Sequence, residues 1–158
     1  AAQMIIEEID DPRIKIFLRE EARKRKIPLI MATDVGSAVQ LDILRYDLNP
    51  RLSLTYGTAD TKLYKIMEEV YNNPGDRKAF FRFVDALIGR AYRRDELAKI
   101  IEGRSEIPTS TMIPQLGSTS AMAGALVAEV AARIRLGHRY PQRIIINKHN
   151  FSVKILAR

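Results

Sequence analysis

The chain has 158 residues, of which 46% are hydrophobic and 28% are charged, and its net charge is +7. This length and balance are those of a soluble globular protein that can bury a core, with no apolar run near the ~20 residues that a membrane-spanning helix requires. The N-terminal residues lack the pattern of a signal peptide. The absence of cysteine excludes disulfides, thiolate zinc sites and cysteine thioesters, so we expect a cytoplasmic protein without zinc.

The positive charge raises the question of nucleic-acid binding. The basic clusters at residues 23–26 and 90–94 are interrupted by apolar residues or lie beside acidic ones such as Glu20 and Glu21. Few aromatic residues accompany them, and no RNA-binding or zinc-finger signature is present. The sequence therefore argues against direct nucleic-acid binding, which we keep as a third alternative.

Residues 4–36 have the pattern of a strand, a helix and a second strand. The apolar start of residues 3–9 predicts the first strand. Asp11 and Pro12 predict a helix start, because aspartate accepts hydrogen bonds from free backbone N–H groups and proline needs none at the first helical position. Residues 27–33 form a continuous apolar run, which is typical of a strand covered on both faces in a parallel sheet. We therefore predict a βαβ unit.

Helical spacing defines the face of this first helix that we expect to be buried. Its residues are Ile14, Phe17, Leu18, Glu21 and Ala22. After a turn at residues 34–37, the alternating side chains of residues 39–45 predict a further strand that is exposed on one side.

Residues 58–103 are predicted to form a helical insert between sheet elements. Apolar residues at helical spacing indicate one helix from Asp60 to the turn at residues 72–75, a second that ends at Gly89, and a short third that ends at Gly103. A lid and a helical cap that only completes the core are both consistent with this pattern.

The longest predicted helix spans residues 117–136 and stops at Gly137. Its small residues are Ala121, Gly124, Ala125, Ala128, Ala131 and Ala132. We expect this small-residue surface to let another backbone approach closely, and the helix to be buried against a sheet. Residues 143–147 then predict a strand. We expect residues 151–156 to form a second strand that pairs with it as a hairpin.

The stretch IIEEIDDPRIKIFLREEARKRKIPLIMATD resembles the second half of the ThiF/MoeB/HesA superfamily, the adenylyltransferases related to ubiquitin-activating enzymes. In that family a strand ending in an Asp-Asn or Asp-Asp pair is followed by a helix and by a strand opening with Ile-Pro. Residues 113–117, IPQLG, and the Ala-rich helix after them are similar to the loop and helix that precede the family's final strands. The resemblance covers residues 4–50 and 112–147.

The resemblance implies that a carboxylate attacks the α-phosphate of ATP, giving an acyl-adenylate. That carboxylate is usually the C-terminus of a small ubiquitin-like or sulfur-carrier protein. Asp10 falls at the family's aspartate after the strand, so the resemblance makes it the catalytic residue that faces ATP and Mg²⁺. Lys15 stands where the family commonly has an arginine, which implies a nucleotide-binding role. From the residues alone, simple N-capping is the preferred explanation of Asp10 and Asp11. Asp34, Tyr46 and Asp47 are further candidates for lining the same crevice.

The chain departs from the family's pattern in one major respect. None of its eight glycines forms the Gly-rich nucleotide loop G-x-G-x-x-G, and the family's phosphate-binding arginine and lysine have no counterpart. We therefore expect that ATP does not bind this chain alone and that a complementary nucleotide-binding segment is needed.

Together these patterns predict an α/β fold with a Rossmann-like sheet of the ThiF type, incomplete at its N-terminal nucleotide-binding half. We expect a single domain or domain fragment, residues 1–158, with a βαβ unit and following strand at residues 4–50. The helical insert follows at 58–103, and the long helix with terminal strands at 112–158. The predicted function is that of one part of an ATP-dependent, carboxylate-activating adenylyltransferase. We expect the chain to form a homo-oligomer or to associate with a complementary nucleotide-binding segment, and not to bind a membrane. The alternative is a non-catalytic interaction module of the same fold.

Overall fold

The computed structural model describes residues 2–35, 37–89 and 117–156. The chain divides into two compact units, one made of Ala1–Leu52 with Pro114–Arg158 and the other of Ser53–Ile113. The second unit contains the predicted helical insert, whose third helix lies outside the described residues. Within the described residues, no helix combines the length and the apolar character needed to span a membrane.

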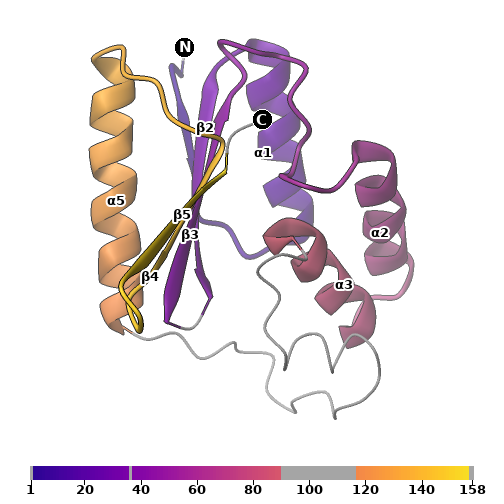
Figure 1. Cartoon of the computed structure of the whole chain (residues 1–158). Coiled ribbons are helices and arrows are strands. Elements are labelled where there is room, and N and C mark those ends of the chain that lie inside the picture. Colours follow the sequence, from indigo (N-terminus) through magenta and orange to yellow (C-terminus); the bar gives the residue numbers. More distant parts are fainter. Residues whose placement is uncertain (1, 36, 90–116, 157–158) are drawn as a thin grey trace. The chain divides into compact units, whose positions relative to one another are not determined.

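The first unit contains a five-stranded mixed sheet in the order β1-β2-β3-β4-β5 (Figure 1). The strands are β1 (Ile5–Glu7), β2 (Pro28–Val35), β3 (Ala38–Arg45), β4 (Arg143–Asn147) and β5 (Ser152–Leu156). β1 and β2 are parallel, and every later pair is antiparallel. The predicted α/β class, the parallel first pair and the C-terminal hairpin are therefore confirmed.

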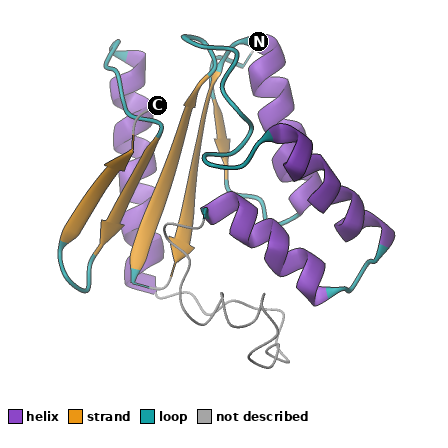
Figure 2. Cartoon of the chain, turned by 45° about the vertical axis from the view of Figure 1, so that its right-hand side comes forward, coloured by secondary structure: helices purple, strands orange, loops and turns teal. Residues whose placement is uncertain are grey.

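Two helices cover opposite faces of this sheet (Figure 2). Helix α1 (Pro12–Arg25) connects β1 to β2, and its N-cap is Asp11, as predicted. Helix α5 (Gly117–Arg135) packs on β2 and β3. Gly137 follows it at φ 85°, a left-handed conformation that glycine adopts without strain, so the predicted stop is confirmed.

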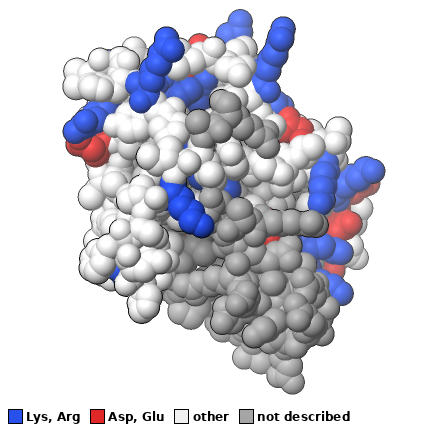
Figure 3. Space-filling model, viewed as in Figure 1, with Lys and Arg blue, Asp and Glu red and all other residues white. Residues whose placement is uncertain are grey.

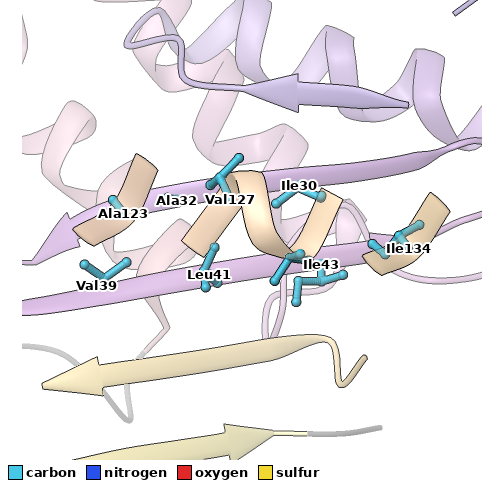
Figure 4. Close-up of a cluster of buried hydrophobic side chains, with 9 residues drawn as sticks. Ile30, Ala32, Val39, Leu41, Ile43, Ala123, Val127 and Ile134 are labelled. Carbon is cyan, nitrogen blue, oxygen red and sulfur yellow. The ribbon is translucent and has the colours of Figure 1, made fainter. Parts of the chain in front are cut away.

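The main hydrophobic core lies between α5 and the sheet (Figure 4). Alternate residues of β2 and β3 point toward α5, because side chains in a strand alternate between the two faces of the sheet. The buried members of this core are Ile30, Ala32, Val39, Leu41, Ile43, Ala123, Val127, Val130 and Ile134.

The face of α5 that packs on the sheet consists mainly of branched residues. Thr119, Ala123, Val127, Val130 and Ile134 are buried. By contrast, the exposed residues include Ala121, Gly124, Ala125, Ala128 and Ala132 of the predicted small-residue surface. The helix is therefore buried against the sheet, as predicted, and it is buried through its branched side chains, which remove more apolar area from water than the small residues would.

The buried face of α1 differs from the predicted one. Ile16, at 5% exposure, is buried, and so are Lys15 and Arg19, whereas Ile14 and Phe17 are 45% and 57% exposed. The helix turns a face with two cations toward the sheet because ion pairs on the sheet satisfy them. The prediction for β3 is wrong in the same way, since both of its faces are buried.

The second unit is built on helices α2 (Asp60–Asn72) and α3 (Arg77–Ile88), which pack against each other. Both helices were predicted, and their buried residues include Leu63, Met67 and Phe83. Asp60 accepts a hydrogen bond of 2.8 Å from the backbone N–H of Leu54, which fixes the segment that enters α2.

Candidate functional site

The two aspartates between β1 and α1 have different surroundings. Asp11 is the N-cap of α1, because its Oδ1 accepts hydrogen bonds from the backbone N–H groups of Arg13 at 2.8 Å and Ile14 at 3.2 Å. These bonds lower the pKa of the Asp11 carboxyl below 3.8. Asp10 is exposed, and it makes no hydrogen bond or ion pair with any residue that the structure describes. Capping therefore accounts for Asp11 and leaves Asp10 available to a ligand.

Asp10 follows the carboxyl end of β1, and Asp34 lies near the carboxyl end of the parallel strand β2. In parallel strands these ends lie at one edge of the sheet, which is where ligands bind in open α/β sheets. Ser120, near the start of α5, donates a hydrogen bond of 2.5 Å to Oδ2 of Asp34. We call this edge, with Asp10, Asp34 and Ser120, the carboxyl edge.

A second set of contacts extends the carboxyl edge toward the β4–β5 turn. The ammonium of Lys148 contacts the hydroxyl of Ser118, and the backbone N–H of Lys148 donates to the carbonyl of Ser37 at 3.0 Å. The turn after β2, the start of α5 and the end of β4 therefore meet here. This arrangement places the ammonium group of Lys148 and several serine hydroxyl groups next to the carboxyl edge.

Glu8 adds a carboxylate to the same part of the chain. Its Oε1 accepts a hydrogen bond of 3.2 Å from the backbone N–H of Ala32. Partial burial of its carboxyl raises the pKa of Glu8 above 4.5, although the residue as a whole is exposed, and the nearby charges of Glu7 and Asp34 raise it further. The polar groups around the end of β1 thus carry excess negative charge, which favours a cation.

Behind this edge, on the α1 side of the sheet, five charged side chains form a buried ionic cluster. Its members are Glu7, Lys15, Arg19, Asp42 and Arg143. Glu7 binds Lys15 Nζ through Oε1 at 2.5 Å and Arg19 Nη2 through Oε2 at 3.4 Å. Arg143 holds Asp42 with two nitrogens, Nε at 2.5 Å and Nη2 at 2.8 Å.

Arg19 joins the two halves of the buried ionic cluster. Its Nη1 lies 3.8 Å from Oδ2 of Asp42, while its Nη2 contacts Glu7. The sulfur of Met31 lies 2.8 Å from Arg19 Nη2 and 3.6 Å from Lys15 Nζ. Three cations share two carboxylates, so the cluster ties α1 to β1, β3 and β4 through charges that cannot separate without leaving an unpaired buried group.

The structure does not bring the two predicted site residues to one point. Asp10 is at the surface, whereas the ammonium of Lys15 is buried on Glu7 and Met31. A phosphate-binding role for Lys15 would require the Glu7 pair to open, and that role stays a prediction. Asp47 lies at the other end of β3, where it pairs with Arg45 at 2.6 Å, so it does not line the edge with Asp10.

Tyr46 is fully buried at that same far end of β3. Sequence reasoning missed Glu7, Arg19, Asp42 and Arg143. In the sequence, these residues stand out only as charged residues within otherwise apolar strands or helix faces. The contact between Ser120 and Asp34 joins residues 86 positions apart, and no local pattern encodes it.

Magnesium in nucleotide sites is usually held by one or two carboxylates together with phosphate oxygens and water. An exposed carboxylate at the end of β1 fits that chemistry, with Asp10 as the protein ligand. Among the described residues there is no group of three or more His, Cys, Asp and Glu that could hold a metal by themselves.

Comparisons with known proteins assign no family. No family model and no curated protein matches the chain. Among solved structures, the chain is similar to the crystal structure of selenomethionine PaaA, with a TM-score of 0.46 and 14% identity over 97% of this chain. The chain spans 41% of the PaaA chain. A likeness of this size assigns neither a fold family nor a function.

Proposed function

We propose that the chain contributes the metal-facing half of an ATP-dependent, carboxylate-activating enzyme of the ThiF type. In this proposal Asp10 faces Mg²⁺ bound to ATP, and a separate Gly-rich segment holds the rest of the nucleotide. The substrate carboxylate is the C-terminus of a small ubiquitin-like or sulfur-carrier protein. ATP would supply the adenylyl group, and the chain's own part is to place one carboxylate next to the metal-bound phosphates.

The main support for this proposal is that only one of the two neighbouring aspartates caps the helix. Asp11 alone caps α1, so helix capping does not explain Asp10. Asp10 is an exposed carboxylate that follows the carboxyl end of a parallel strand. This is the position expected for a ligand-facing residue in an α/β sheet.

The edge of the sheet at β1 gives independent support. β1 is the end of the strand order, so nothing that the structure describes pairs with its outer side. Exposed apolar side chains flank it on both faces: Ile6, at 52% exposure, on the α5 side, and Ile14 and Phe17 on α1. An open strand edge with apolar flanks favours association with another α/β segment. A complementary nucleotide-binding segment would cover it.

Isothermal titration with Mg-ATP tests the proposal. The isolated chain is expected to show no saturable binding, and a mixture with a separately produced Gly-rich nucleotide-binding segment is expected to bind. In that mixture Asp10→Asn should weaken binding at least tenfold. Asp11→Asn is the matched control. It removes the carboxylate next to Asp10 but keeps the helix cap, because asparagine also caps helices. Tight binding by the isolated chain, or equal effects of the two variants, would contradict the proposal.

The engagement of Lys15 with Glu7 favours a second candidate function. A lysine held in the buried ionic cluster has a structural role, as expected for a non-catalytic interaction module that keeps the fold. The same titration separates the two candidates, since the module requires that Asp10→Asn leave Mg-ATP binding of the mixture unchanged.

A further inference from the structure

Three segments that are distant in sequence meet at the end of the first unit opposite the carboxyl edge. Arg23, in the last turn of α1, donates to the carbonyl of Leu52 at 3.4 Å. Arg45, at the end of β3, donates to the carbonyl of His138, just after α5, at 3.0 Å. The end of α1, the segment after β3 and the end of α5 therefore form one surface, which we call the basic end. It comprises residues 20–26, 45–52 and 129–139.

The basic end holds most of the net charge of the protein. Its three segments contain nine Lys and Arg residues against four Asp and Glu residues, an excess of five out of the total of +7. Figure 3 shows Lys and Arg side chains gathered along the top of the view, where Figure 1 places the ends of α1 and α5. The fold thus brings together cations from three segments that are separate in the sequence.

The acidic residues of this surface are engaged locally. Glu21 pairs with Arg25 at 2.9 Å, and Asp47 pairs with Arg45 at 2.6 Å. Although burial opposes it, the hydrogen bonds and charge of Arg45 lower the pKa of Asp47 below 3.8, so this pair stays ionised at neutral pH. By contrast, the exposed cations Lys26, Arg51 and Arg139 form no ion pair with any residue that the structure describes. These cations are available to an external anion.

We propose that the basic end binds the phosphate backbone of a nucleic acid. Seven of its nine cations are arginines, whose planar guanidinium groups bind phosphate with two parallel hydrogen bonds. Duplex DNA carries one negative charge per ~1.7 Å, a density that an acidic peptide does not reach at one residue per ~3.3 Å. The cations come from three segments that meet around one end, which suits a broad polyanion more than a single extended peptide.

The proposed contact is with the phosphate backbone of the nucleic acid and does not depend on its base sequence. Within the basic end, Tyr46 is fully buried, and Tyr140, the residue after its last segment, is half-buried, so no exposed tyrosine, phenylalanine or tryptophan ring of these described residues is available for base stacking. Binding of this kind depends on phosphate neutralisation and falls steeply with salt.

Fluorescence anisotropy with a fluorescein-labelled 20-base-pair DNA duplex, at salt concentrations from 50 to 300 mM, tests the proposal. Neutralisation of about five phosphates predicts a slope of about −4.5 for log K against log salt. The triple variant Lys26→Ala, Arg51→Ala, Arg139→Ala should reduce the magnitude of the slope by about 3 and weaken binding at least tenfold. The matched control removes three exposed lysines of the second unit, Lys62, Lys65 and Lys78, and should bind nearly as the unaltered chain does.

Three results would overturn this proposal. Absence of binding at 50 mM salt is the first, and equal weakening by the control triple variant, which would indicate a non-specific effect of net charge, is the second. The third is tighter binding of a labelled poly-glutamate peptide than of the duplex at the same salt, which would assign the basic end to an acidic protein instead. Unchanged melting temperatures of both triple variants exclude unfolding as the cause of lost binding.

Discussion

Carboxylates at the end of β1 differ in what holds them. Asp11 is fixed by two backbone N–H groups, Glu8 by the N–H of Ala32, and Asp10 by no residue that the structure describes. Hydrogen bonds stabilise the charged form of Asp11, whereas burial opposes the charged form of Glu8. Neighbouring acids in one short stretch therefore contribute to stability with opposite dependence on pH.

Glu8→Gln is expected to stabilise the protein at neutral pH. A carboxyl whose pKa is raised by folding binds its proton more tightly in the folded state, so stability falls as pH rises from its unfolded value, near 4.5, through the folded value. Glutamine keeps the acceptor for the Ala32 N–H without the charge. The melting temperature of the variant should exceed that of the unaltered protein at pH 7, and the difference should vanish below pH 4. A difference that is larger at low pH would contradict this assignment.

The buried ionic cluster predicts an asymmetry between its two ends. Asp42→Asn leaves three cations with Glu7 alone, and removal of one partner from a buried ion pair typically costs about 3–5 kcal/mol. Arg143→Met should cost less, because Asp42 retains Arg19 at 3.8 Å and the charges of the cluster then balance. Urea denaturation measures both free energies of unfolding. Equal losses, or a larger loss for Arg143→Met, would show that Arg19 does not couple the two halves.

At the scale of the element, α1 shows how far local sequence predicts burial. Its limits follow from Asp11, Pro12 and the approach of Pro28, and the structure confirms them. Its buried face does not follow from apolar spacing, because Lys15 and Arg19 find their carboxylates on β1 and β3. Those partners are defined only once the sheet has formed. The face of a helix is therefore predictable only where burial is driven by apolar area alone.

A pair of neighbouring substitutions tests the face of α1. Ile16→Ala should destabilise the protein by about 2–5 kcal/mol, because Ile16 is buried and a cavity is left. Phe17→Ala should change stability by less than about 0.5 kcal/mol, since Phe17 is 57% exposed. Urea denaturation of both variants provides the comparison. A larger loss for Phe17→Ala would restore the face predicted from helical spacing.

The strands show the same division between what is local and what is not. The continuous apolar run of β2 and the hairpin of β4 and β5 were predictable from residue type. The exposed side expected for β3 was wrong because Gln40 and Asp42 are buried, with Asp42 paired to a residue 101 positions away. In the candidate site, the role of Asp10 was predicted from the family resemblance, whereas the contact of Asp34 with Ser120 required the fold.

At the scale of the whole molecule, the first unit separates its charges between its two ends. The carboxyl edge carries Asp10, Asp34 and Glu8, and the basic end carries the excess of cations. A cation and a polyanion are thereby directed to different ends of the same sheet. The proposed metal-facing role and the proposed nucleic-acid contact are consequently separable by substitution.

Paramagnetic broadening by Mn²⁺ tests the central claim, that Asp10 faces a divalent cation, most directly. In ¹⁵N amide spectra of the labelled chain, mixed with the unlabelled Gly-rich nucleotide-binding segment and ATP, a small amount of Mn²⁺ should selectively broaden the signals of residues 8–13. Asp10→Asn should abolish this broadening, and Asp11→Asn should retain it. Broadening that persists in Asp10→Asn, or that centres on another carboxylate such as Asp47, would contradict the metal-facing role of Asp10.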